Sequence, residues 1–318
     1  MRASPADLAE QVRAGSHQAA ARLISLLEDG DPEGLAALRA LPPEREAYTV
    51  GITGPPGAGK STLVDALTRL VRAEGATVGI IAVDPTSPFT GGALLGDRIR
   101  MQEHSTDPGV FVRSMATRGH LGGLAPATLD AARVLAALGV DLVLVETVGA
   151  GQAEVDVVTA ADTVVVVAVP GMGDALQTLK AGIMEIGDVF AVNKADRPDA
   201  DRTVVELRMM LHLAPQEGWR PPVVRTVATM GEGVAELLAA VRQHRAHLEA
   251  SEALEARRRR RRRQAVLRAL EARVQEAVLA RARHDPVVAA VLEEAERGVL
   301  DARAAADRLL QHLERAGR

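Results

Sequence analysis

One short segment of this 318-residue chain has the spacing of a phosphate-binding loop. It fits the pattern G-x-x-x-x-G-K-[ST] and consists of Gly54, Pro55, Pro56, Gly57, Ala58, Gly59, Lys60, Ser61 and Thr62. Glycines let the backbone fold into a nest of N–H donors, and a helix that begins there adds positive potential. In this pattern the lysine neutralises phosphate charge and the serine hydroxyl ligates Mg²⁺. The segment therefore predicts a site for a nucleoside triphosphate and Mg²⁺.

A second segment, Asn193-Lys194-Ala195-Asp196, follows an apolar run that we expect to be a strand. A carboxylate in this place can accept hydrogen bonds from both N1–H and the exocyclic amine of guanine. Adenine presents the opposite donor pattern on that edge, so Asp196 favours GTP over ATP. Together with the phosphate-binding loop, Asn193, Lys194 and Asp196 predict a guanine-nucleotide site.

Three acidic side chains are candidates for contact with the metal ion. Glu146 ends an apolar run three residues before Gly149, where P-loop GTPases carry an acid near Mg²⁺ and a glycine that meets the γ-phosphate. Asp84 and Asp97 lie on one segment that follows another strand, from which both can reach Mg²⁺ or the attacking water. The expected Mg²⁺ ligands are therefore Ser61, Asp84, Asp97 and Glu146.

Two departures from the usual pattern bear on catalysis. Glutamate replaces the usual aspartate at position 146, and its extra methylene indicates contact with the metal through a water molecule. Gln152 lies three residues after Gly149 instead of directly after it, so no glutamine stands in the usual water-orienting place. We therefore expect the isolated protein to hydrolyse GTP slowly.

The elements that must position these residues alternate as in a series of βαβ units. Short apolar, β-branched runs alternate with amphipathic stretches and predict strands at 48–53, 77–83, 110–114, 142–146, 163–169, 189–192 and 223–227. Most of the runs are almost continuously apolar, which is typical of strands covered on both faces. We predict an α/β fold with a mostly parallel sheet.

The two ends of the chain have helical patterns without strands. We expect a helical extension at 1–47, the nucleotide-binding domain at 48–250 and a helical region at 251–318. In the last region, Asp285 before Pro286 is a typical N-cap and first-turn pair. That region either packs on the nucleotide-binding domain or forms a dimerisation hairpin. The seven arginines at 257–263 are interpreted as a solvated helix segment, because acidic residues precede and follow them.

Composition excludes several other chemistries. The chain has no cysteine, which excludes disulfides, thiolate zinc sites and cysteine nucleophiles. Its net charge of −4 gives no indication of nucleic-acid binding. No apolar run reaches the roughly 18 residues of a membrane span, and the N-terminus lacks the apolar core of a secretory signal. We therefore expect a cytoplasmic protein with no nucleic-acid or membrane partner.

The ordered set of motifs resembles the MeaB/ArgK family over nearly the whole chain. The matching segments are GPPGAGKST, DPTSPFTGGALLGDRIRM, RGHLGG, ETVGAGQAE, PGMGDALQTLKAG and NKAD. The second and fourth are specific to this family, whereas the first and last are shared by many GTPases. The resemblance implies a P-loop NTPase of the signal-recognition, MinD and BioD type, with an N-terminal helical extension and a C-terminal hairpin that makes a homodimer.

For function, the resemblance implies a GTPase chaperone of an adenosylcobalamin-dependent acyl-CoA mutase of the methylmalonyl-CoA mutase type. Such a protein binds GTP and GDP with Mg²⁺, gates cobalamin loading and protects the mutase, and an adenosyltransferase is a further candidate partner. Carried over to this sequence, the catalytic residues are Lys60, Asp84, Asp97, Glu146 and Lys180. Lys180 belongs to a segment at 170–182 that senses the mutase, so hydrolysis is expected to be stimulated by the partner.

The resemblance also implies a second guanine-contacting loop at Val227, Ala228 and Thr229. The family's loop usually begins with serine, so Val227 is a departure and its side chain cannot give the serine's support. The backbone N–H of Ala228 is expected to meet guanine O6.

Two other functions stay open at this point. A nickel metallochaperone GTPase of related fold needs clustered Cys or His ligands, and this chain has no cysteine and eight dispersed histidines. A kinase linked to amino-acid transport, an older interpretation attached to the ArgK name, needs a catalytic loop with a base Asp and an Mg²⁺-binding Asn. No segment resembles such a loop, so the mutase chaperone is the leading interpretation.

Overall fold

The computed structural model describes residues 4–42, 46–84, 106–116, 126–147, 160–171, 183–213, 218–282 and 284–316. The chain divides into two compact units, residues 1–258 and 259–318. The first unit contains the sheet and the nucleotide-binding motifs. The second contains most of α12 (Ala253–Ala282), together with α13 (Pro286–Glu296) and α14 (Ala302–Ala316).

A seven-stranded parallel sheet forms the centre of the first unit. The strands are β1 Tyr48–Thr53, β2 Val78–Asp84, β3 Val110–Ala116, β4 Leu142–Thr147, β5 Thr163–Ala168, β6 Val189–Asn193 and β7 Val223–Thr226. They lie in the order β3-β2-β4-β1-β5-β6-β7, and each neighbouring pair is parallel. The predicted α/β fold with a parallel sheet is confirmed.

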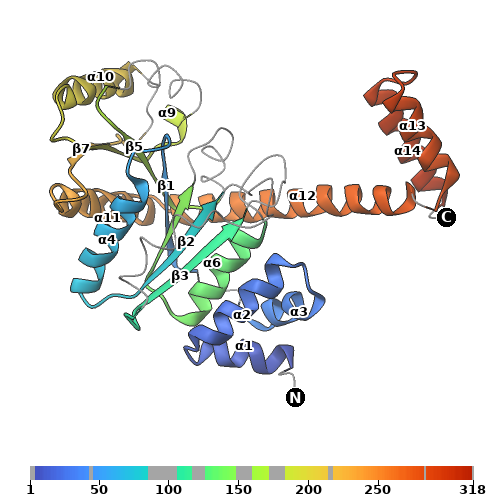
Figure 1. Cartoon of the computed structure of the whole chain (residues 1–318), viewed down its shortest axis with the longest axis horizontal. Coiled ribbons are helices and arrows are strands. Elements are labelled where there is room, and N and C mark those ends of the chain that lie inside the picture. The colour runs from blue at the N-terminus through green and yellow to red at the C-terminus, as the bar shows by residue number, and fades with distance from the viewer. Residues whose placement is uncertain are drawn as a thin grey trace. The chain divides into compact units, whose positions relative to one another are not determined.

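Helices cover both faces of this sheet (Figure 1), and β5 shows how the sequence requires that. Val164 and Val166 belong to the core beneath α6 (Pro126–Leu138) and α10 (Ala200–Leu213). Val165 and Val167 belong to the opposite core, with α4 (Lys60–Ala73) and α11 (Val234–Ala250). All of β5 is buried, which explains its continuous apolar run.

The N-terminal extension consists of three short helices, α1 (Pro5–Arg13), α2 (His17–Glu28) and α3 (Pro32–Ala40). Their starts are fixed by N-cap side chains: Ser4 forms a capping box, and Ser16 and Asp31 each accept from a backbone N–H of the first turn. The buried face of α2 packs against α6, so the extension shares the core on that side of the sheet (Figure 1).

The C-terminal helices begin largely where the sequence indicates. Asp285 accepts hydrogen bonds from the N–H groups of Val287 and Val288 at 2.9 and 3.4 Å, which confirms the predicted N-cap of α13. In the described part of the chain, no helix combines the length and apolar character that crossing a membrane requires.

The interpretation of the arginine run as a solvated segment is wrong for its first two members. Arg257 pairs with Asp188 and Arg258 with Asp162, two buried aspartates directly before β6 and β5. The side chain of Arg258 is only 15% exposed. Arg260 and Arg263, further along the same helix, are exposed. The run therefore has a partly buried beginning and a largely exposed remainder.

A buried histidine on α11 lies beside these aspartates. The Nδ1 atom of His244 is 2.8 Å from the Thr163 hydroxyl, and its Nε2 atom is 3.3 Å from a carboxylate oxygen of Asp188. The ring of Trp219 stacks at an angle, 4.9 Å away between centroids. Burial lowers the pKa of His244 to about 4 in spite of the nearby carboxylate, so the ring is neutral at pH 7.

His244 is expected to make the fold sensitive to acid. The unfolded chain protonates this residue near pH 6.5 and the folded protein near pH 4, so stability falls as the pH falls through that window. Through this residue alone, the free energy of unfolding at pH 5 should be about 2 kcal/mol lower than at pH 7.5. Urea unfolding at both pH values measures the difference.

The variant His244→Gln should lose this pH dependence, whereas His212→Gln, at an exposed position, should keep it. An unchanged dependence in the His244 variant would contradict the assignment.

Candidate functional site

The loop between β1 and α4 needs glycine at two positions because of close neighbours. Gly54 has a φ of +144°, and a Cβ there would lie 2.2 Å from the carbonyl oxygen of Val167 in β5. Gly59, the N-cap of α4, has a φ of +85°, and a Cβ there would lie 2.5 Å from the amide nitrogen of Asn193. Because glycine has no Cβ, the loop backbone can pass close to β5 at Gly54 and to the Asn193 side chain at Gly59.

Lys60 lies in the first turn of α4 and extends back over the loop. Its Nζ atom donates to the carbonyl oxygens of Gly54 at 2.7 Å and Pro55 at 3.0 Å, and the residue is buried. The ammonium group therefore adds to the positive potential of the helix N-terminus. Such a site can bind the phosphates of a nucleotide.

The side-chain amide of Asn193 connects three loops at the end of β6. Its nitrogen donates to the carbonyl oxygen of Ala58 at 2.8 Å. Its oxygen accepts from the Thr226 hydroxyl at 3.2 Å and from the N–H of Ala228 at 3.1 Å. The residue is 2% exposed, so these bonds form where water does not compete. One side chain thus connects the phosphate-binding loop with both guanine-contacting segments of the sequence analysis.

The same segments enclose a cavity of about 200 Å³. It is lined by Gly59, Thr62, Asn193, Lys194, Asp196, Arg197, Val227, Ala228 and Thr229. Lys194 also bridges to the phosphate-binding loop, because its Nζ atom donates to the carbonyl oxygen of Gly57 at 2.7 Å. The fold therefore places the end of the phosphate-binding loop, the Asn-Lys-Ala-Asp motif and the 227–229 segment around one hollow.

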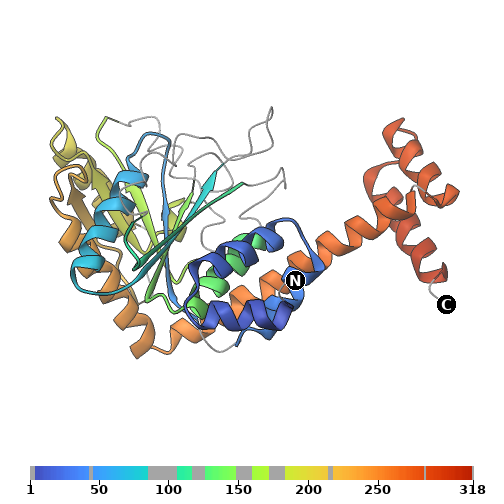
Figure 2. The same ribbon diagram turned by 60° about the horizontal axis from the view of Figure 1, so that its bottom comes forward.

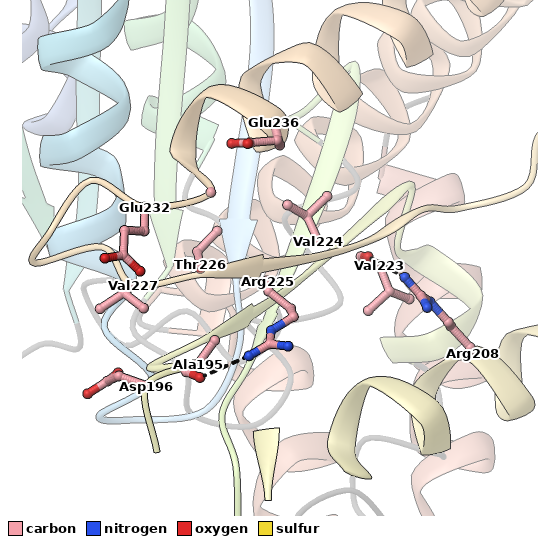
Figure 3. A pocket seen from close by; sticks show the side chains of 11 residues that line it. Ala195, Asp196, Arg208, Val223, Val224, Arg225, Thr226, Val227, Glu232 and Glu236 are labelled. Atoms are coloured by element: carbon pink, nitrogen blue, oxygen red, sulfur yellow. Dashed lines mark hydrogen bonds between the residues drawn. The ribbon is translucent and has the colours of Figure 1, made fainter. Parts of the chain in front are cut away.

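A larger hollow of about 490 Å³ runs beside the edge strand β7 (Figure 3). It shares Asp196 and Val227 with the smaller cavity, but no residue of 54–62 lines it. Figure 3 shows Arg225 directed at Ala195, whose carbonyl oxygen it reaches at 3.3 Å. Because a nucleotide needs the phosphate-binding loop, the smaller cavity is the candidate base site.

Two oxygen-bearing side chains meet on the other side of the phosphate-binding loop. The Ser61 hydroxyl donates to the carboxylate of Glu146 at 2.6 Å. Glu146 lies near the end of β4, between Ile52 of β1 and Ala82 of β2. A hydroxyl and a carboxylate side by side fit the hard oxygen ligands that Mg²⁺ prefers, and Mg²⁺ needs few protein ligands when phosphate supplies others. The described residues contain no group of three or more acidic or histidine side chains suited to a metal.

Several predicted site residues lie outside what the structure describes. They are Asp97, Gly149 and Lys180, and Gln152 is also among them. The backbone of Asp84 ends β2, but its side chain is outside the described part. Their roles stay predictions.

Thr226 is a residue of this site that the sequence analysis missed. It is buried, and its hydroxyl reaches Asn193 because β6 and β7 pair Asn193 with Thr226. No motif marks this threonine in the sequence. Its position directly before Val227 was the available signal. Only the register between β6 and β7 shows that this position lies opposite Asn193.

Comparison with known proteins decides the family. A family model described as methylmalonyl Co-A mutase-associated GTPase MeaB matches residues 20–285. The chain belongs to this MeaB family. The resemblance found in the sequence motifs is thereby confirmed, and the family and fold imply that the chain binds a guanine nucleotide.

Relatives extend the family match to activity and fold. A Pyrococcus abyssi protein named as a GTPase is 59% identical over 254 residues, which cover 78% of each chain. The GTPase ArgK of Escherichia coli is 34% identical over 263 residues, 80% of each chain. The crystal structure of a LAO/AO transport system kinase covers 99% of both chains, with 26% identity and a TM-score of 0.72. This MeaB-family chain is a P-loop GTPase.

Thr226 gives a direct test of the Asn193 network. Thr226→Val removes the hydroxyl but keeps the shape, so Asn193 loses one hydrogen bond, a change of about 1 kcal/mol. We expect GDP to bind roughly 5-fold more weakly, as measured by fluorescence titration with a labelled GDP. Thr226→Ser keeps the hydroxyl and should bind GDP like the wild type. Equal affinity in the valine variant would show that the hydroxyl does not support the base site.

Proposed function

We propose that this MeaB-family GTPase is a chaperone of an adenosylcobalamin-dependent acyl-CoA mutase of the methylmalonyl-CoA mutase type. In this proposal, GTP hydrolysis gates the loading of cobalamin and protects the mutase. The observation that carries it is the match to a family described by its association with methylmalonyl-CoA mutase. The arrangement of the guanine-nucleotide site supports the GTP-dependent part of the cycle.

In the proposed site, Lys60 pairs with the β- and γ-phosphates after exchanging its bonds to the loop carbonyls. Ser61 and Glu146 would hold Mg²⁺, with Asp84 and Asp97 as further ligands or water contacts. Bound Mg²⁺ supplies positive charge that neutralises the phosphate oxygens. The hydrogen bond between Ser61 and Glu146 supports this assignment, because it holds the serine hydroxyl beside the carboxylate that is expected to contact the metal through a water molecule.

The base is bound by the small cavity in this proposal. Asp196 accepts from N1–H and the exocyclic amine of guanine. The N–H of Ala228, which was expected to meet O6, instead donates to the side-chain oxygen of Asn193 at 3.1 Å. Asn193 does not need to touch the base. Its bonds to Ala58 and Ala228 keep the phosphate and base subsites at a fixed separation.

Control of GTP hydrolysis by the mutase distinguishes the proposed chaperone from a GTPase that acts alone. Lys180 lies in the 170–182 segment that is proposed to sense the mutase, and Gln152 is displaced from the usual water-orienting place. Slow hydrolysis by the isolated protein and faster hydrolysis in the complex follow from these two features. An adenosyltransferase is the further proposed partner.

The chaperone proposal predicts that a purified mutase accelerates hydrolysis. GTP turnover by the full chain should rise at least about 10-fold on adding a cobalamin-dependent acyl-CoA mutase from the same organism, as expected of a partner that completes a catalytic site. Phosphate release measures the rate, and Lys60→Ala should abolish turnover with and without the mutase. If no such mutase stimulates hydrolysis or binds the protein, the chaperone proposal is wrong, although the GTPase assignment stands.

A homodimer is the proposed assembly state, with the C-terminal helices as the interface. An apolar stripe on α12 supports it, because large side chains at helical spacing are 42 to 67% exposed there: Val266, Leu267, Leu270 and Val274.

Light scattering after size exclusion should give twice the chain mass of 33.5 kDa. Leu270→Glu places a charge in the stripe and should shift the protein toward the monomer, whereas the exposed Arg260→Glu should not. A wild-type monomer at micromolar concentration would contradict the dimer.

A further inference from the structure

Two buried aspartates join the starts of three neighbouring strands, β1, β5 and β6. Asp162, directly before β5, is fully buried and accepts from the N–H of Thr49 in β1 at 3.0 Å. Asp188, directly before β6, is 7% exposed and accepts from the N–H of Val164 in β5 at 2.8 Å. Because strands that run parallel start at the same edge, the two carboxylates fix β1, β5 and β6 relative to one another there.

The first turns of α12 bring two arginines to these carboxylates. Both nitrogens of the Arg257 fork donate to Asp188 at 2.8 Å, and one also donates to the carbonyl oxygen of Asp162. Arg258 donates to the two carboxylate oxygens of Asp162 at 3.2 and 3.0 Å. These are forked pairs, the strongest geometry for a guanidinium and a carboxylate. Figure 2 shows the beginning of α12, in orange, at the end of the sheet where the strands start.

The pairing is required by the burial of the acids. A carboxylate removed from water is stable only when an opposite charge and hydrogen bonds replace its hydration. Removing one partner of a buried pair leaves an uncompensated charge, which is strongly destabilising. Arg257 and Arg258 are therefore partly buried partners of interior carboxylates of the first unit, unlike the exposed Arg260 and Arg263 that follow them.

The other ends of the same three strands carry the nucleotide site. β1 runs into Gly54, and the Val167 carbonyl of β5 lies against that glycine. β6 ends at Asn193, the side chain that connects the phosphate and base loops. The strands have only six, six and five residues, so about 20 Å of buried sheet separates the aspartates from the site.

We propose that Arg257 and Arg258 are positioning residues for the guanine-nucleotide site: through Asp188 and Asp162 they fix the starts of β1, β5 and β6, whose ends place Gly54 and Asn193. They touch neither nucleotide nor metal. The two arginines affect the separation and orientation of the phosphate and base loops. Their loss should therefore weaken nucleotide binding without slowing the hydrolytic step. The proposal does not depend on the identity of the protein partner.

The test uses the full chain with Arg257→Gln and Arg258→Gln together. The affinity for GDP, titrated at 25 °C in Mg²⁺ buffer, is expected to fall roughly 3- to 30-fold, the range for mutations that act along a packed network. The melting temperature should fall by about 10 °C, since two buried carboxylates lose their partners. The turnover number at saturating GTP should stay within about 2-fold of the wild type.

A matched control lies on the same helix. The double variant Arg260→Gln/Arg263→Gln also removes two positive charges, but from exposed positions. It should change neither the affinity for GDP nor the melting temperature. Adding Asp162→Asn and Asp188→Asn to the Arg257/Arg258 variant removes the unpaired charges while an amide oxygen can still accept from Thr49 and Val164. This fourfold variant should recover most of the lost GDP affinity.

The proposal is overturned if the Arg257/Arg258 variant melts lower but binds GDP within 2-fold of the wild type, because the pairs then support stability alone. It is also overturned if the Arg260/Arg263 control loses affinity to the same extent. If the double variant does not fold, Arg257→Lys replaces it, since lysine keeps the charge and loses the fork. An affinity for GDP unchanged in that variant likewise rejects the positioning role.

Discussion

The buried amide of Asn193 is the contact on which the geometry of the site depends. It holds the carbonyl of Ala58 on one side and the hydroxyl of Thr226 and N–H of Ala228 on the other. The proposed phosphate and base subsites come from segments more than 130 residues apart in sequence, so the chain alone does not set the distance between them. A short, water-excluded amide with a partner on each side sets it instead. Gly59 must lack a Cβ because this amide occupies the space.

The parallel sheet gives this contact its place. All strands end at one edge, where β1, β4 and β6 deliver the phosphate-binding loop, Glu146 and Asn193. All strands start at the other edge, where the carboxylates of Asp162 and Asp188 accept hydrogen bonds from two arginines of α12. The sheet therefore has a candidate nucleotide edge and a charged edge, and β1, β5 and β6 join them through five or six buried residues each. In the positioning proposal, these three strands carry the effect of Arg257 and Arg258 to the other edge.

The sequence allowed the strands and both nucleotide motifs to be predicted because their signals are local. Continuous β-branched runs mark parallel strands, and the glycine spacing of 54–62 reflects contacts within a few residues. Thr226 and Arg257 were missed because their roles depend on partners far along the chain, such as Asp188, 69 residues before Arg257. Seven identical arginines look alike in sequence, and only the fold distinguishes the two that pair with buried aspartates from exposed ones such as Arg260 and Arg263.

The central claim is that Asp196 reads guanine in a cavity held open by Asn193, and one change of base tests it. Xanthine has a carbonyl where guanine has its exocyclic amine, so an amide at position 196 can donate to xanthine but no longer matches guanine. The affinities of the wild type and of Asp196→Asn for GDP and XDP should therefore reverse in order, with GDP preferred by the wild type and XDP by the variant. A variant that still prefers GDP would contradict the account, because guanine would then be recognised elsewhere.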